Sequence, residues 1–141
     1  MLIGISHFIS PDLLELLCSM GHGDELVLAD SNFPGASIAR RLVRADGISI
    51  TDLLSGIAPL FPFDQYAHPL FMMEVVPGDT LDLAVEADYM KVIRQHHPKI
   101  ASPQRIERNA FYERARNAFG VLMSGETRIY GNLIIKKGVI S

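Results

Sequence analysis

Residues 20–30 read MGHGDELVLAD, a histidine between two glycines followed by a short apolar run that ends at a carboxylate. The run at 26–29 (LVLA) does not alternate with polar residues, and this pattern is typical of a strand that is covered on both faces. His22 stands before this strand and Asp30 directly after it. The stretch predicts a layered core whose first strand has a chemically versatile side chain near each end.

Helices and strands are predicted to alternate along the rest of the chain. Ser10 can cap a helix that Pro11 and Asp12 begin, and Gly21 is a plausible left-handed stop. The remaining apolar patterns indicate helices over 37–42, 51–60, 82–97 and 111–119, and strands over 70–76, 105–108, 121–123 and 133–135. This alternation predicts an α/β fold with a largely parallel sheet. At 141 residues, without a repeat or a linker, the chain is expected to form a single domain over residues 1–141.

The composition argues against several classes of protein. The hydrophobic fraction of 48% and the charged fraction of 21% are those of a globular protein. A net charge of −3 indicates no basic surface for nucleic acid or for an anionic membrane. Cys18 is the single cysteine, so no intrachain disulfide can form, and no apolar run approaches the ~20 residues that span a bilayer. We therefore expect a cytoplasmic protein.

Motifs for nucleotides and metals are missing from the sequence. Residues 21–23 lack the third glycine of a dinucleotide fingerprint, and there is no GxxxxGK(S/T) phosphate loop. His96 and His97 have no further ligand at metal-binding spacing. Cys18 lies in an apolar helix and is interpreted as a core residue rather than a nucleophile. We expect neither a metal nor a cofactor.

His22 allows two interpretations. Glycines on both sides leave its ring uncrowded and its backbone free, which suits a side chain that must reach a ligand. Alternatively, Gly21 caps the preceding helix and His22 interacts with the helix dipole. Asp30 has a similar pair of readings, as a hydrogen-bond acceptor for a ligand or as the cap of the next turn. The residues alone leave these alternatives open.

A second candidate site lies at residues 130–132. Tyr130, Gly131 and Asn132 place an aromatic hydroxyl and an amide around a flexible glycine, just before an apolar strand. A polyhydroxylated ligand needs a stacking surface and groups that donate and accept, although Gly and Asn also favour a simple turn. Arg108, beside Glu107, is either half of a surface ion pair or a fork of donors for hydroxyls.

Taken together, the motifs of the chain resemble one protein family. The matching segments run nearly from end to end: 10–11, 20–25, 30, 33–34, 44–47, 69–73, 78–81, 111–115, 124–126 and 130–132. Each segment is short, but their order and spacing are specific. The chain resembles the family of monosaccharide mutarotases that includes L-fucose mutarotase and D-ribose pyranase.

The resemblance implies an isomerase that interconverts the α and β anomers of L-fucose without a cofactor. It implies that His22 is the catalytic proton donor, since a histidine can donate and accept protons near neutral pH. The sugar would be held by Asp30, Arg108, Tyr130, Gly131 and Asn132. The resemblance further implies a three-layer α/β/α subunit with a mixed, mainly parallel sheet, assembled into a ring-like homodecamer with sites completed near subunit contacts. The alternatives are a ribose-type pyranase, which converts pyranose to furanose, and a non-catalytic sugar-binding or transport-accessory protein.

Overall fold

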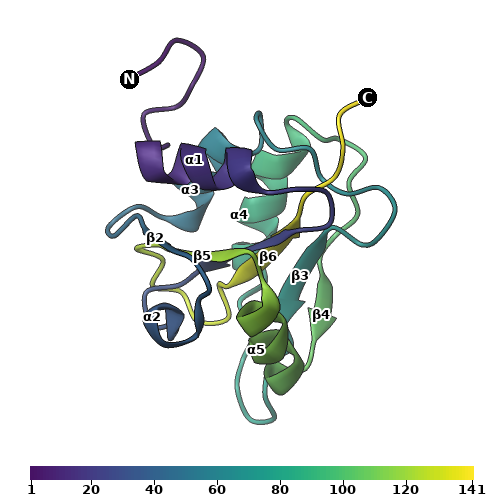
Figure 1. Cartoon of the computed structure of the whole chain (residues 1–141). Coiled ribbons are helices and arrows are strands. Elements are labelled where there is room, and N and C mark those ends of the chain that lie inside the picture. Colours follow the sequence, from purple (N-terminus) through teal and green to yellow (C-terminus); the bar gives the residue numbers. More distant parts are fainter.

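The computed structural model describes residues 1–141 as one mixed sheet covered by helices on both faces (Figure 1). The strands are β1 (Glu25–Ala29), β2 (Leu42–Arg44), β3 (Leu70–Met73), β4 (Gln104–Ile106), β5 (Gly120–Met123) and β6 (Leu133–Lys136). Their order across the sheet is β2-β5-β1-β6-β3-β4. β6 is antiparallel to both of its neighbours, and the remaining pairs are parallel. The predicted mixed, mainly parallel sheet is therefore confirmed.

Five helices complete the layers: α1 (Pro11–Ser19), α2 (Gly35–Ile38), α3 (Ile50–Ile57), α4 (Leu83–Arg94) and α5 (Arg108–Asn117). In Figure 1, α1, α3 and α4 lie on one face of the sheet, and α2 and α5 lie on the other. Leu26 and Leu28 of β1 join the larger core on the first face, whereas Val27 and Ala29 join the smaller core on the second. Both faces of β1 are thus buried, as the apolar run predicts.

Because of the position of β6, two loops lie together at the end of the sheet where β1 and β3 finish. Leu28 of β1 is paired with Leu133 of β6, and Met72 of β3 is paired with the same residue. Because β6 runs antiparallel, its amino end lies beside the carboxyl ends of β1 and β3. The residues that follow β1 and those that precede β6 are therefore neighbours, which is the usual location of ligands in such sheets.

Two local predictions are wrong. The predicted helix over 37–42 is only the single turn of α2, and residues 42–44 form the edge strand β2, paired with β5. The stop after α1 is also misplaced, because Met20 is the C-cap in extended backbone and Gly21 does not adopt a positive φ. Gly23, with φ of 86°, is the left-handed residue of this loop.

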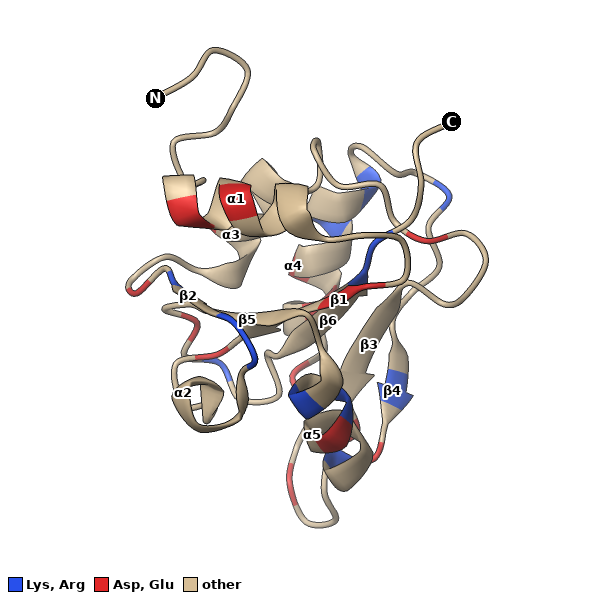
Figure 2. Cartoon of the chain, in the orientation of Figure 1, with Lys and Arg blue, Asp and Glu red and all other residues tan.

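Charged residues lie on helices of both faces of the sheet. In Figure 2 acidic segments lie on α1, and both signs occur on α5. Cys18 is exposed on α1, which corrects its interpretation as a core residue. None of the helices combines the length and the apolar character needed to cross a membrane.

Candidate functional site

Asp30 and Asn132 are joined at the carboxyl end of β1. The backbone N–H of Asp30 donates to Oδ1 of Asn132 at 2.7 Å, and both residues are buried. Oδ1 of Asp30 accepts from the backbone N–H of Asn32 at 3.0 Å, so the carboxylate is fixed by the turn that follows the strand. The Asp30 side chain therefore caps the turn after β1 and lies at the carboxyl end of that strand.

Burial raises the pKa of Asp30 above its ordinary value. The Asn32 backbone and the Asn132 amide stabilise the ionised form and oppose this effect, while the negative charge of Glu126 adds to it. A carboxylate in such surroundings gains from new hydrogen-bond donors, because its own environment solvates it poorly. Sugar hydroxyls are donors of that kind.

Tyr130 is held in an unusual backbone conformation next to this pair. Its φ of 58° is the one positive φ in the chain outside glycine. The Tyr130 hydroxyl donates to Oδ2 of Asp79 at 2.5 Å and accepts from the N–H of Val76 at 3.1 Å. The bond to Asp79 raises the pKa of Tyr130, so the phenol stays protonated and its hydrogen is held by Asp79. Non-glycine residues in left-handed backbone are uncommon and cluster at functional sites.

Arg108 approaches the same region from α5. It begins α5, and the expectation that residues 105–108 form a strand is corrected to a strand that ends at Ile106. A cation at a helix N-terminus is unfavourable with respect to the helix dipole, so this position does not serve helix stability. The Arg108 guanidinium lies 5.7 Å from the ring centre of Tyr112, which itself stacks on Phe33.

These groups line a single cavity of about 310 Å³. The wall contains four of the predicted sugar-binding residues, three acceptors or donors around them, and several apolar side chains. The full lining is Asp30, Asn32, Phe33, Met73, Val76, Asp79, Arg108, Tyr112, Ile129, Tyr130 and Asn132. A mixture of apolar walls and a few oriented polar groups is typical of a small-molecule site.

Gly131 does not line the cavity but fixes the loop that does. Its carbonyl accepts from the Tyr89 hydroxyl at 2.7 Å, and a Cβ at this position would lie only 2.8 Å from the Arg128 carbonyl oxygen. Glycine is therefore needed here for close backbone contact. In this geometry Gly131 shapes the loop, and its part in sugar binding stays a prediction.

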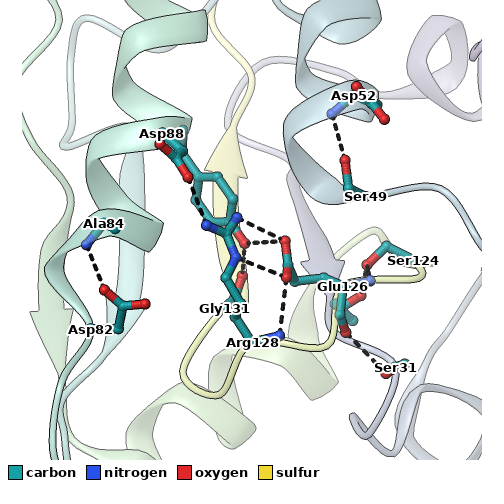
Figure 3. Close-up of polar contacts among 12 residues, drawn as sticks. Ser31, Ser49, Asp52, Asp82, Ala84, Asp88, Ser124, Glu126, Arg128 and Gly131 are labelled. Carbon is teal, nitrogen blue, oxygen red and sulfur yellow. Dashed lines mark hydrogen bonds and ion pairs between the residues drawn. The ribbon is translucent and has the colours of Figure 1, made fainter.

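A partly buried ion pair between Glu126 and Arg128 supports the same loop, and sequence reasoning missed it. Figure 3 shows the Arg128 side chain between Glu126 and Asp88. Although burial opposes ionisation, the hydrogen bonds from Arg128 hold the pKa of Glu126 below its usual value. Glu126 and Arg128 are only two residues apart, but the sequence gives little signal for the cluster because their partners Asp88 and Tyr89 come from α4, far away in the chain.

His22 lies at the other end of β1 and is absent from this cavity. The five residues of β1 lie between it and Asp30, and a strand of that length spans roughly 17 Å at about 3.3 Å per residue. The His22 side chain is 45% exposed, and its Nε2 lies 3.2 Å from Oδ1 of Asp64. The structure therefore separates His22 from the other predicted site residues within one chain. It also replaces the helix-dipole interpretation with a carboxylate contact.

Outside the cavity, the side chains form no metal centre but line a second hollow. No group of three or more His, Cys, Asp or Glu side chains is arranged to hold a metal ion. His97 is partly buried, with Nε2 against the Ala58 carbonyl and its ring against Phe63. It lines an open hollow of about 720 Å³ that also includes Asp64 and Lys99.

Comparison with known proteins gives a consistent result. Residues 3–140 match the RbsD / FucU transport protein family. A relative from Histophilus somni strain 129Pt, named L-fucose mutarotase, is 56% identical over 99% of this chain and 97% of its own. The solved Streptococcus pneumoniae fucose mutarotase in complex with L-fucose has a TM-score of 0.94 at 42% identity, covering 99% of this chain and all of that one.

A more distant structure shares the fold alone. Bacillus subtilis RbsD complexed with D-ribose has a TM-score of 0.76 at 15% identity, and the match covers 100% of each chain. Since the family match and the high identity both extend over nearly the whole sequence, this chain belongs to the RbsD / FucU transport protein family.

Proposed function

We propose that this protein is an isomerase, an L-fucose mutarotase that interconverts the α and β anomers of the sugar. The observation that carries this proposal is the convergence of Asp30, Arg108, Tyr130 and Asn132 on one cavity. These side chains come from three separate parts of the chain: the turn after β1, the start of α5 and the loop before β6. Relatives named for the same activity align over almost the full length of the chain.

Interconversion of the α and β anomers needs proton transfers and no redox step. In ring opening, the ring oxygen gains a proton, the C1–O5 bond breaks with its electron pair going to O5, and the anomeric hydroxyl loses a proton as C1=O1 forms. Rotation of the aldehyde and the reverse steps then close the ring on the other face. In this proposal His22 donates the proton to O5, and a positioned acid of this kind typically contributes ~10²–10⁴-fold.

The separation of His22 from the cavity leads to a requirement for assembly. A histidine side chain cannot bridge the length of β1, so we place the His22 of one subunit at the cavity of another. The resemblance to a family of ring-like decamers supports this arrangement, and we infer that the protein is a homodecamer. We further infer that it acts on its sugar in the cytoplasm.

Two other functions compete with this one. A ribose-type pyranase shares the fold, but Arg108 stands where the resemblance gives ribose-type members a histidine. A non-catalytic sugar-binding protein would keep the cavity, but it would not need the exposed, carboxylate-bound His22.

Proton NMR can separate these functions. Magnetisation exchange between anomeric protons is measured for L-fucose, D-galactose and D-ribose at equal enzyme concentration. We expect the fastest catalysed exchange with L-fucose. Faster exchange with D-ribose would favour the pyranase, and sugar binding without exchange would favour the accessory protein.

A further inference from the structure

The segment that follows β5 holds the backbone on both sides of Asp30. The N–H and Oγ of Ser124 donate to the carbonyl of Ala29 at 3.0 and 2.6 Å. The N–H and Oγ of Ser31 donate to the carbonyl of Glu126 at 2.8 and 2.9 Å. The turn that carries Asp30 is therefore fixed by the segment that ends at Glu126.

The side chain of Glu126 points to the other sugar-binding loop (Figure 3). Its Oε1 accepts from the backbone N–H and from Nε of Arg128, each at 3.0 Å, and its Oε2 accepts from Nη2 of Arg128 at 3.0 Å. The Glu126 side chain is 5% exposed, so its carboxylate is shielded from water. Three bonds to one carboxylate fix the loop two residues before Tyr130.

Tyr89 of α4 holds the same loop at Gly131. It is fully buried, and its hydroxyl donates to the Gly131 carbonyl at 2.7 Å and lies 3.5 Å from Oε2 of Glu126. Burial raises the pKa of Tyr89, so the hydroxyl keeps the hydrogen that it donates. A Cβ on Gly131 would lie 3.1 Å from Cγ of Glu126 and 3.1 Å from the Tyr89 hydroxyl. The residue that precedes Asn132 is thus packed directly against Glu126 and Tyr89.

Glu126 stays ionised although it lies inside the protein. Burial disfavours its charge, but hydrogen bonds from the side chain and the backbone of Arg128 lower the pKa of Glu126 below its usual value. Hydrogen bonds between ionised partners are about twice as strong as neutral ones. Glu126, Arg128 and Tyr89 do not line the cavity, so their influence on a ligand passes through the residues that they hold.

We propose that Glu126 is a positioning residue for sugar binding, which holds the turn of Asp30 and the loop of residues 130–132 in one arrangement. Its carbonyl fixes the turn, its carboxylate fixes the loop through Arg128, and the 2.7 Å bond from Asp30 N–H to Oδ1 of Asn132 joins the two. Binding groups that are 102 residues apart in the chain therefore keep a constant spacing. This inference rests on the proposed sugar function, and it adds which residue sets the distance between the groups that bind the sugar.

The first test measures the two segments without any sugar. Glu126→Gln keeps the shape of the side chain, but it loses one acceptor oxygen and turns an amide N–H toward the guanidinium of Arg128. Hydrogen–deuterium exchange followed by mass spectrometry should then be faster in residues 127–132 and 30–33, with little change in α1. Unchanged exchange in both segments would overturn the proposal, and so would faster exchange in residues 127–132 alone.

The second test measures L-fucose binding by isothermal titration, well below the thermal midpoints of the variants. Glu126→Gln should raise the Kd by roughly 10–100-fold, the range typical of residues that orient a binding side chain. Catalysed anomer exchange at saturating sugar should fall less than the affinity, because His22 is untouched. Tyr89→Phe removes the bond to Gly131 and should raise the Kd as well. A wild-type Kd in folded Glu126→Gln protein would overturn the positioning role.

Two further variants separate positioning from a general loss of stability. Glu86→Gln breaks another partly buried ion pair of α4, that with Arg105 at 3.2 Å, and should keep the wild-type Kd. An equal rise in Kd in this control would overturn the proposal.

Should Glu126→Gln fail to fold, Arg128→Lys tests the same link, because it keeps the charge but loses the two-pronged contact with the carboxylate. It is expected to raise the Kd, and a wild-type Kd would overturn the link. Wild-type protein that binds no L-fucose, but whose two segments respond to Glu126→Gln as expected, would reject the proposed function and not the link through Glu126.

Discussion

His22 and Asp30 lie at opposite ends of β1, with the five residues of that strand between them. The cavity is lined by Asp30, Arg108, Tyr130 and Asn132, so the cavity of one chain gathers most of the groups for recognition, whereas the candidate acid of that chain lies elsewhere. This division makes catalysis and binding separable by mutation. In the proposed assembly, the two functions at one site also come from different subunits.

Replacement of His22 tests the proton transfer. His22→Asn keeps a hydrogen-bonding side chain but cannot transfer a proton, so we expect catalysed exchange to fall by about 10²–10⁴-fold. The thermal midpoint should change little, because the His22 side chain is exposed. His96→Asn, on an exposed site, is the control. Wild-type exchange in folded His22→Asn protein would remove His22 from the mechanism.

Mixed assemblies test whether the site is shared. His22→Asn and Asp30→Ala subunits carrying different tags are co-expressed, and the mixed oligomers are purified and assayed. Random pairing of an intact His22 with an intact cavity restores up to about a quarter of the sites. Activity no higher than that of the two separate variants would show that both residues act from one chain. Sedimentation at the assay concentration establishes whether an oligomer is present.

Arg108 is expected to act in binding. Its guanidinium stays protonated in proteins and cannot shuttle protons. Arg108→Ala should raise the Kd for L-fucose by roughly 10–100-fold, since a hydrogen bond from a charged donor contributes about 1.5–3 kcal/mol. Isothermal titration measures the change. Arg116→Ala removes an exposed arginine of the same helix and should leave Kd unchanged; an equal loss in both variants would indicate a general effect of charge.

The buried charge of Asp30 is expected to lower the thermal midpoint at neutral pH and to strengthen sugar binding. Its folded-state pKa is raised above the unfolded value of 3.8, so its contribution is complete below that pH and is lost as pH rises through the folded pKa. Asp30→Asn removes the buried charge and keeps the acceptor for Asn32 N–H. We expect a higher thermal midpoint at neutral pH, together with about tenfold weaker sugar binding. A lower midpoint at neutral pH would contradict this account.

Glu126 has the opposite dependence on pH. Its pKa is lowered in the fold, so its contribution is present above the unfolded value of 4.5 and is lost as pH falls through the folded pKa. Glu126→Gln should cost about 1–3 kcal/mol of unfolding free energy at neutral pH. The gap to wild type should narrow in acid, as measured by urea unfolding at several pH values. Glu113→Gln, which breaks an exposed pair, should cost less than about 1 kcal/mol.

The sequence predicted the parts of the molecule that local pattern controls. The apolar run of β1 and the N-cap of α1 were found because burial on both faces and helix capping leave signals within a few residues. β2 was missed because Leu42 and Arg44 are exposed, and the strand depends on pairing with β5 rather than on its own apolar pattern.

The candidate site divides in the same way. Asp30, Arg108, Tyr130 and Asn132 could be named from residue type and resemblance, and the structure brings them to one cavity. The contact of His22 with Asp64 could not, because it joins residues 42 positions apart across a loop of irregular backbone. Such pairings depend on the register of the whole sheet.

The central place of β6 has a consequence for how the chain is made. Its residues 133–136 separate β1 from β3 in the sheet, yet they are the latest strand in chain order. During synthesis, the facing edges of β1 and β3 therefore stay unpaired until residues 133–136 have left the ribosome. The sheet closes in one late event, and until then the exposed strand edges are open to association with other chains.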